Sequence, residues 1–339
     1  MSEITTQQIK LTRKDFVSSS EVRWCPGCGD YAVLANMQRV LPDLATAKEK
    51  YVFVSGIGCS SRFPYYMDTY GFHGIHGRAP AIASGVKLAN PELEVWVITG
   101  DGDGFSIGGN HMIHILRRNI DLNIILFNNR IYGLTKGQYS PTSKLGMKTK
   151  SSPFGSVDRP FNPASVAFGA EATFIARALD VDAKSIQEVM LRGQKHKGTS
   201  FIEVYQNCVI FNDGEFEDVS NKQTRPDNAL YVEHGKPMVF GKDNDKGIII
   251  DGSHPKVVTL GDKFTPENIL HHDETNPIIT NMLLQMTLDP VFPTPFGVLR
   301  AVVAPTYDEM LYRQIEEAKE KRGQGTLETL FYSGDTWEV

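Results

Sequence analysis

Between residues 23 and 208, short apolar runs alternate with amphipathic stretches whose apolar residues recur at helical spacing. The apolar runs are rich in Val, Ile and Phe, which is typical of buried strands that enter loops. This pattern predicts strands at 51–58, 94–104 (with a glycine-rich turn at its end), 123–129, 172–179 and 199–208. The amphipathic stretches predict helices at 31–41, 78–88, 106–118, 162–170 and 182–197.

The order of these elements predicts an α/β fold. Strands separated by helices of about 10–15 residues are joined by right-handed crossovers, which build a mostly parallel sheet flanked by helices on both faces. Ligands of such folds bind at the carboxyl ends of the strands. The loops at 56–60, 100–104 and 128–135 follow strand ends, and Cys208 lies just past another. We therefore expect these loops to face one crevice.

The character of the sequence divides the chain into three parts. Residues 1–22 are polar and are expected to form a loosely held N-terminal arm, whereas 23–215 should form the ligand-binding domain. From there on, polar loop sequence dominates, with short strand-like runs and a late helix that starts at Thr306 and ends at Gly323. We expect 216–339 to be a C-terminal extension that contacts another subunit.

Composition and charge narrow the class of protein. Of 339 residues, 41% are hydrophobic and 22% charged, with a net charge of −5 and a pI near 6.0. These values argue against a disordered chain and against a basic nucleic-acid-binding domain. No run of about 18 apolar residues predicts a membrane span. The N-terminal stretch lacks the apolar core of a signal peptide, so we expect a cytoplasmic protein.

The chain contains four cysteines, Cys25, Cys28, Cys59 and Cys208. Structural disulfides are rare in a reducing cytosol, while four thiolates are enough to close one metal or iron–sulfur site. Cys25 and Cys28 form a CxxC pair, which suits a zinc site, an iron–sulfur cluster or a redox-active dithiol. The residues by themselves leave these alternatives open, although a redox dithiol would leave Cys59 and Cys208 unexplained.

A second motif joins two of the predicted strand ends. GDG at 100–102 and NN at 128–129 are separated by 25 residues. Glycines let the backbone approach a phosphate closely. Asp101 and Asn129, with the backbone carbonyl of Ile131, offer the oxygen ligands that Mg²⁺ prefers when a diphosphate supplies others. Each half alone is also typical of an ordinary β-turn, but the pair at this spacing predicts a magnesium–diphosphate site.

The GDG and NN pair is similar to the diphosphate motif of thiamine-dependent enzymes. From Trp24 to about Cys208, the chain resembles the β subunit of the 2-oxoacid:ferredoxin oxidoreductases, and most closely the members that use 2-oxoglutarate or general 2-oxoacids. The segments that carry the resemblance are WCPGCGD (24–30), GIGCSSR (56–62), HGRAPAIASGVKLANP (76–91), ITGDGDG (98–104) and FNNRIYGLTKGQYSPTS (127–143).

This resemblance implies the thiamine diphosphate-binding fold and three cofactors: thiamine diphosphate, Mg²⁺ and one [4Fe–4S] cluster. The implied reaction is the reversible oxidative decarboxylation of 2-oxoglutarate to succinyl-CoA and CO₂, with electrons passed through the cluster to ferredoxin. The same reaction on pyruvate or on a broad range of 2-oxoacids is the alternative. A remoter alternative is a non-catalytic Cys₄ zinc module, in which GDG and NN serve only as turns.

The resemblance also assigns roles to individual residues. All four cysteines would hold the cluster, which relays single electrons as zinc cannot. Arg62 would grip a substrate carboxylate with two hydrogen bonds, unless it is an ordinary surface arginine. The residues implied to contact thiamine diphosphate are Ile57, Gly58, Cys59, Ser60, His76, Gly100, Gly102, Asp103, Gly133 and Leu134. The implied Mg²⁺ ligands are Asp101, Asn129 and Ile131.

One chemical group is missing from these motifs. Thiamine activation needs a carboxylate beside the aminopyrimidine ring, and no Glu in the matching segments is placed to supply it. In the family the α subunit provides this group. The resemblance therefore implies an α subunit as partner, in a heterodimer or a dimer of heterodimers, alongside ferredoxin, the 2-oxoacid and coenzyme A. This chain alone is expected to be inactive.

Overall fold

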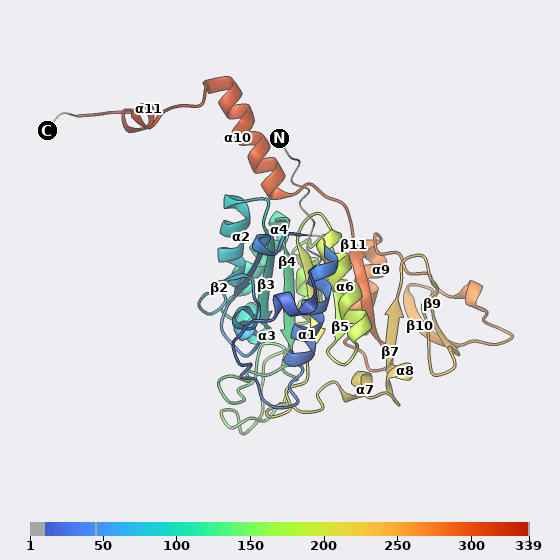
Figure 1. The fold of residues 1–339 in the computed structure, drawn as a ribbon. Helices are drawn as coiled ribbons and strands as arrows, with labels where there is room; N and C mark the ends of the chain where they lie inside the picture. Colours follow the sequence, from blue (N-terminus) through green and yellow to red (C-terminus); the bar gives the residue numbers. More distant parts are fainter. Residues whose placement is uncertain (1–10, 45, 338–339) are drawn as a thin grey trace, which may run out of the picture.

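A computed structural model describes residues 11–44 and 46–337, and its centre is an eight-stranded sheet (Figure 1). In spatial order the strands are β2 (Tyr70–His73), β1 (Tyr51–Ser55), β3 (Glu94–Gly100), β4 (Asn123–Asn128), β6 (Ser200–Tyr205), β5 (Phe174–Leu179), β11 (Thr294–Ala301) and β7 (Ala229–Val232). All neighbouring strands are parallel except β11 and β5, which are antiparallel. The predicted α/β class and the mostly parallel sheet are confirmed.

Helices cover both faces of the sheet, as the alternation of its buried side chains requires. Phe53 and Trp96 point to one face, in a core shared with α1 (Asp30–Val40) and α6 (Ala183–Lys195). Val52 and Val95 point to the other face. There the helices are α2 (Ala79–Ala89), α4 (Gly109–Arg118), α5 (Pro163–Gly169) and α9 (Pro277–Met286). Strands buried on both sides explain why their sequences are continuously apolar.

Polar residues set where several of these helices begin. The side chain of Asp182 accepts a hydrogen bond from the Ser185 amide at the start of α6. The side chain of Asn162 likewise accepts one from the Ser165 amide at the start of α5. The remaining short elements are helical turns at Arg13–Phe16, Leu41–Leu44, Lys48–Lys50, Ser60–Tyr66 and Pro266–Asn268, with α7 (Glu217–Ser220) and α8 (Arg225–Asn228).

The glycine-rich segment after β3 differs from the prediction. Residues Asp101–Phe105 form a short helix, α3, where a turn was predicted, and the next helix starts at Gly109 rather than at residue 106. The backbone is closely packed at Gly108, between these two helices. A Cβ there would lie 2.5 Å from the Asp103 carbonyl oxygen and 2.9 Å from the Cα of Gly77, a contact between distant loops that the local sequence pattern does not predict.

The two predicted chain divisions also differ from the structure. Phe16 is fully buried against Tyr51, with ring centroids 5.8 Å apart, so the described part of the predicted N-terminal arm packs on the body. Residues 1–10 of that arm lie outside the described residues. At the other end, β7 and β11 belong to the main sheet, so a boundary at residue 215 cuts through one continuous sheet. Local sequence pattern carries no signal for such long-range strand pairing.

Two parts of the C-terminal region stand apart from the main sheet. One is a small antiparallel sheet of β8 (Val239–Phe240), β9 (Lys246–Asp251) and β10 (His254–Thr259). The other is an arm made of α10 (Tyr307–Arg322) and α11 (Leu327–Phe331), which projects from the body (Figure 1). No helix among the described residues is long and apolar enough to cross a membrane.

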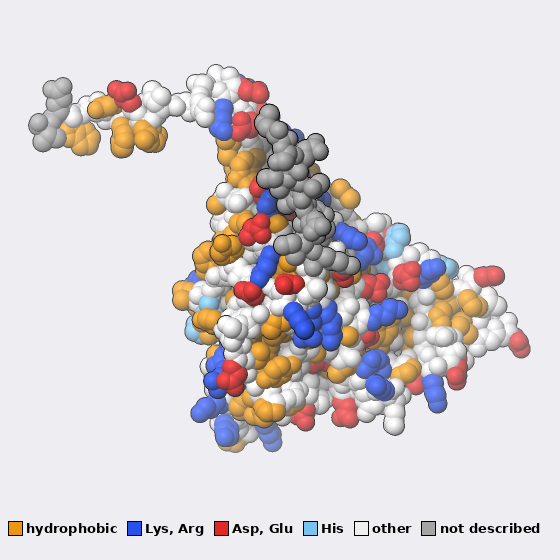
Figure 2. Space-filling model, in the orientation of Figure 1, with side chains coloured by type: hydrophobic (Ala, Val, Ile, Leu, Met, Phe, Trp, Pro, Cys, Tyr) orange, Lys and Arg blue, Asp and Glu red, His pale blue; other side chains and the backbone are white. Residues whose placement is uncertain are grey.

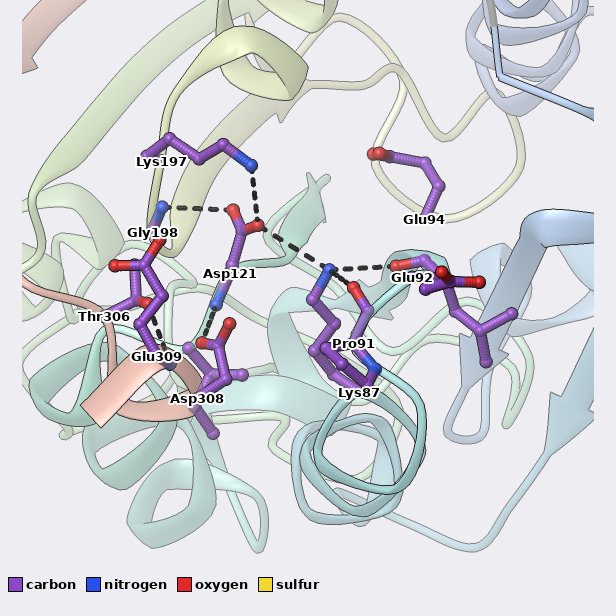
Figure 3. Close-up of polar contacts among 12 residues, drawn as sticks. Lys87, Pro91, Glu92, Glu94, Asp121, Lys197, Gly198, Thr306, Asp308 and Glu309 are labelled. Carbon is purple, nitrogen blue, oxygen red and sulfur yellow. Dashed lines mark hydrogen bonds and ion pairs between the residues drawn. The ribbon is translucent and has the colours of Figure 1, made fainter. Parts of the chain in front are cut away.

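The arm is anchored at the amino-terminal edge of the sheet by a polar network (Figure 3). The carboxylate of Asp308 accepts a hydrogen bond from the Asp121 amide at 3.0 Å, and the Thr306 hydroxyl caps the start of α10. Asp121 in turn lies 3.2 Å from the Lys197 ammonium and 3.6 Å from that of the buried Lys87. This edge is opposite the loops at the carboxyl ends of the strands.

Candidate functional site

A cavity of about 410 Å³ opens where the carboxyl ends of β1, β3 and β4 meet. Its lining contains every residue predicted to contact thiamine diphosphate and all three predicted Mg²⁺ ligands. Five further lining residues carried no prediction: Ile107, Phe127, Tyr132, Thr135 and Gln138. The topology explains the gathering, because parallel strands bring their carboxyl ends to one edge of the sheet.

Asp101 lines this cavity, and its side chain is buried. Its Oδ2 accepts hydrogen bonds from the hydroxyls of Ser140 and Thr142, both at 2.5 Å. Burial raises the pKa of Asp101 to about 6, and the two hydroxyl hydrogen bonds act in the opposite direction by stabilising the carboxylate. A buried carboxylate held at a fixed orientation is a suitable ligand for a hard cation.

Asp103 also lines the cavity, but its carboxylate is engaged by the protein. Oδ1 accepts hydrogen bonds from the amides of Ile57 at 3.1 Å and Gly77 at 2.6 Å, while Oδ2 accepts one from the Thr99 hydroxyl at 2.7 Å. The predicted role of Asp103 was to contact the cofactor near its phosphates. In the structure this carboxylate ties the loops after β1 and β2 to the GDG segment, so it sets the shape of the cavity.

Glycines in these loops are required by close packing. A Cβ on Gly56 would lie 2.0 Å from the Asp103 carboxylate, and one on Gly102 would lie 2.2 Å from the ring of Tyr132. The Tyr132 hydroxyl donates a hydrogen bond to the Gly102 carbonyl at 3.1 Å. Tyr132 therefore closes one side of the cavity against the GDG segment. Its place in the NNRIYG run was the only sequence signal for it.

The NN segment is held in place by a hydrogen bond to a buried ion pair. Asn128 donates a hydrogen bond to the Glu203 carboxylate at 2.8 Å, and Glu203 pairs with Arg177 at 2.8 Å. Both charged side chains are fully buried. The next residue, Asn129, faces the cavity and its Oδ1 accepts a hydrogen bond from the Ile131 amide at 3.2 Å. The two predicted metal ligands of this segment are thus held by one turn.

A second cavity, of about 240 Å³, is lined by all four cysteines. It adjoins the first, because Cys59, Asn129, Gly133 and Leu134 line both. A Cβ on Gly133 would lie 3.5 Å from the Cys59 sulfur and 3.6 Å from that of Cys208, so these sulfurs flank the same glycine. The fold thus brings the thiols of the Cys25 and Cys28 pair together with those of Cys59 and Cys208, which are distant from the pair in sequence.

The surroundings of these cysteines disfavour the charged thiolate form of Cys28 and Cys59. Burial, with the nearby Asp30 carboxylate and neighbouring thiols, raises the pKa of Cys28 and raises that of Cys59 to about 12. A bound cation or cluster reverses this effect, because its positive charge stabilises thiolates. In 11–44 and 46–337, no three His, Cys, Asp or Glu side chains are grouped for a single metal ion.

Arg62 lies on the cysteine cavity rather than on the larger one. It donates a hydrogen bond from its guanidinium to the Arg23 carbonyl at 3.2 Å, and its positive charge acts to lower the pKa of Cys59. The predicted contact with a substrate carboxylate would therefore occur beside Cys59, at the border of the two cavities.

Comparisons with known proteins agree with this geometry. Residues 56–204 match the family described as "Thiamine pyrophosphate enzyme, C-terminal TPP binding domain". The chain is 50% identical to the 2-oxoglutarate oxidoreductase subunit KorB of Mycobacterium tuberculosis, over 96% of this chain and 88% of that one. It is 45% identical to a 2-oxoacid:ferredoxin oxidoreductase subunit beta of Saccharolobus solfataricus, over 59% of this chain and 66% of that one.

A solved structure extends the likeness to three dimensions. It is the 2-oxoglutarate:ferredoxin oxidoreductase from Magnetococcus marinus, with 2-oxoglutarate, coenzyme A and succinyl-CoA bound. The TM-score is 0.76 and the sequence identity 30%, with 99% of this chain and 100% of that chain covered. The likeness therefore includes the C-terminal region that the sequence motifs do not reach.

Proposed function

Because the chain belongs to the β subunits of the 2-oxoacid:ferredoxin oxidoreductases, as its motifs predicted, we propose that it catalyses CoA-acylating oxidation of 2-oxoglutarate together with an α subunit. The products would be succinyl-CoA and CO₂, with electrons passed to ferredoxin, and the reaction would be reversible. The observation that carries this proposal is the contact between two cavities, one lined by the GDG segment and Asn129 and one lined by four cysteines.

The larger cavity is the proposed site of thiamine diphosphate. When bound, thiamine diphosphate supplies the nucleophilic carbon and the electron sink for loss of CO₂. Asp101, Asn129 and the carbonyl of Ile131 would hold Mg²⁺ against the diphosphate, since all three line one cavity and offer oxygen ligands. The glycines of the GDG segment would let the backbone approach the phosphates. Leu134 and Tyr132 would border the thiamine rings.

The smaller cavity is the proposed site of a [4Fe–4S] cluster. Its four thiols line one cavity, and thiols are the donors that such clusters use. A cluster held there would supply one-electron transfer beside the thiamine site, which zinc would not. Arg62 would attract the substrate carboxylate at the border of the two cavities.

The α subunit is proposed to complete the active site. In the part of the chain that the structure describes, the only acidic side chains lining the larger cavity are Asp101 and Asp103. Both belong to the diphosphate segment, so neither is free to serve the aminopyrimidine ring. Two large apolar side chains of the cavity lining, Ile107 and Leu134, are exposed. Exposed apolar side chains beside a site are typical of a surface that a partner covers.

The C-terminal arm is proposed to make further subunit contacts within a heterodimer or a dimer of heterodimers. Apolar side chains gather along it (Figure 2). Leu327, Leu330 and Phe331 are all at least two-thirds exposed, although α11 is only a five-residue helix. A helix this short is not stable in water by itself, so we expect its apolar side chains to pack against another subunit. The arm leaves the body at the edge opposite the cavities, so this contact would be separate from the active site.

The proposal is tested by purifying the chain anaerobically, alone and co-expressed with its α subunit. We expect a brown complex with iron, acid-labile sulfide and thiamine diphosphate, and CoA-dependent reduction of ferredoxin by 2-oxoglutarate. The chain alone should show no such activity. A colourless zinc-loaded protein would contradict the cluster, and full activity without the partner would contradict the shared active site.

A substrate panel on the same complex separates the two catalytic alternatives. The names of the M. tuberculosis and M. marinus relatives favour 2-oxoglutarate, and the M. marinus structure carries that substrate. We therefore expect the highest kcat/KM with 2-oxoglutarate. A complex that prefers pyruvate, or that treats several 2-oxoacids alike, would instead support the pyruvate or broad-range alternative.

A further inference from the structure

Gln206 lies between the two cavities and touches a predicted ligand of each. It directly follows β6, where its backbone amide donates a hydrogen bond to the Asn128 carbonyl at 3.0 Å. Its side chain is almost completely buried, with 1% of its surface exposed. A buried amide needs partners for both its oxygen and its nitrogen, and these partners define what the side chain does.

The amide nitrogen of Gln206 faces the cysteine cavity. Nε2 donates a hydrogen bond to the Asn207 carbonyl at 2.6 Å and another to the Cys28 sulfur at 3.2 Å. On the other side, its Oε1 accepts a hydrogen bond from Nδ2 of Asn129 at 2.8 Å. The side chain therefore connects a predicted cluster ligand to a predicted Mg²⁺ ligand.

The directions of these hydrogen bonds are fixed by a single backbone carbonyl. Because the Asn207 carbonyl can only accept, the side-chain atom of Gln206 beside it must be the nitrogen. The oxygen of Gln206 then faces Asn129, whose nitrogen must face it in return. This leaves Oδ1 of Asn129 on the opposite side, where it accepts from the Ile131 amide and can reach the larger cavity.

We propose that Gln206 is a positioning residue that couples the two cofactor sites, by orienting the Asn129 carboxamide toward Mg²⁺ and by donating a hydrogen bond to the Cys28 sulfur. This inference rests on the proposed function. It assigns two effects to one side chain: tighter Mg²⁺ binding in the thiamine site, and a higher reduction potential of the cluster.

The effect on the cluster follows from charge. Reduction adds negative charge, which spreads onto the cysteine sulfurs, so an N–H donor stabilises the reduced form more than the oxidised form. Hydrogen bonds to the sulfurs are one of the main determinants of cluster potential. Loss of one buried hydrogen bond of this kind should lower the equilibrium constant for reduction about tenfold. For a one-electron couple that is a shift of about 59 mV to lower potential.

The effect on Mg²⁺ follows from orientation. Without an acceptor at Gln206, the amide of Asn129 loses the partner that keeps its nitrogen away from the metal. A carboxamide free to turn presents a donor to the cation for part of the time. We expect Mg²⁺ to bind about tenfold more weakly when this partner is lost, in the range typical of residues that orient a metal ligand.

Two substitutions separate these effects in the complex with the α subunit. Gln206→Leu removes both the donor and the acceptor, so the potential should fall and Mg²⁺ should bind more weakly. Gln206→Glu keeps an acceptor for Asn129 in either protonation state but has no N–H for Cys28. It should therefore lower the potential while leaving Mg²⁺ affinity within about twofold of the unsubstituted complex.

Gln38→Leu is the matched control. Gln38 is also buried, with 3% of its surface exposed, and donates to a backbone carbonyl, that of Tyr66, at 3.2 Å. It touches neither cavity. The control should therefore lose stability comparable to that lost in Gln206→Leu, with no change in potential or Mg²⁺ affinity.

The measurements are an electron paramagnetic resonance titration of the cluster potential and a Mg²⁺ titration of thiamine diphosphate binding. A potential in Gln206→Leu equal to that of Gln38→Leu would overturn the role at Cys28. Equal Mg²⁺ affinities in Gln206→Leu and the control would overturn the role at Asn129. Failure of the proposed function looks different, because the unsubstituted complex would then show no [4Fe–4S] signal or no thiamine diphosphate binding.

Discussion

The ion pair between Arg177 and Glu203 is the most deeply buried charged feature beneath the active site. The guanidinium Nε lies 2.8 Å from the Glu203 carboxylate, and both side chains are fully buried. Arg177 also donates to the Thr287 hydroxyl at 2.9 Å, and Glu203 accepts from the Asn128 side chain at 2.8 Å. The ring of Tyr205 lies 5.1 Å from the guanidinium carbon. The pair therefore supports the NN segment from inside the sheet.

Removing one partner leaves the other charge buried without compensation. Among the described residues, Arg177→Met leaves the Glu203 carboxylate with the Asn128 amide as its one side-chain donor. We expect a loss of about 3–5 kcal/mol of unfolding free energy. Glu203→Leu should lower the free energy of unfolding by at least as much, because it leaves both the Arg177 guanidinium and the Asn128 amide without their acceptor. The free energy of unfolding of a typical domain is about 5–15 kcal/mol, so either substitution removes a large share of it.

The double variant Arg177→Met/Glu203→Leu removes both charges of this buried pair. Its main remaining cost is the unpaired donor of Asn128, about 1–3 kcal/mol, so it should be more stable than either single variant. Denaturant unfolding of all four proteins, compared at constant m value, gives the coupling free energy. Single costs below about 1 kcal/mol, or a double variant as unstable as the sum of the two, would refute the assignment of a charge-compensated pair.

Three further changes test the loops and the fold around the site. Gly102→Ala should displace the ring of Tyr132 and weaken thiamine diphosphate binding at least tenfold, as measured by titration of the complex. The control is Gly85→Ala, where the added Cβ meets open space, and it should keep wild-type affinity. Asp103→Ala should raise the dissociation constant for thiamine diphosphate, and it should make the two loops that the carboxylate joins more sensitive to protease. Unchanged values would show that these loops keep their conformation without the carboxylate. Burial lowers the pKa of His196 to about 4, below its ordinary value of 6.5. As the pH falls, the unfolded state therefore binds the proton before the folded state does, and the free energy of unfolding should decrease from pH 6.5 to 4. Unfolding midpoints measured across this range should depend less on pH in His196→Gln.

The sequence by itself determined the class of fold, the family and the residues gathered at the site. Continuous apolar runs such as 124–127 are buried on both sides of the sheet, and this burial is what makes their signal strong. Motifs placed directly after such runs must meet at one edge, because parallel strands share the direction of their carboxyl ends. For that reason Asp101, Asn129 and Cys208 could be assigned to neighbouring sites without knowledge of the structure.

Only the tertiary structure decided the features that depend on contacts between distant segments. β2 has exposed side chains throughout and no apolar pattern, so its place at the sheet edge comes from backbone pairing with β1. β11 joins the main sheet from the far end of the chain, through antiparallel pairing with β5. The hydrogen bonds of Asp103 and Gln206 likewise join loops that are distant in sequence. Sequence spacing tells which residues reach an edge of the sheet, but the partner of each polar group depends on packing in three dimensions.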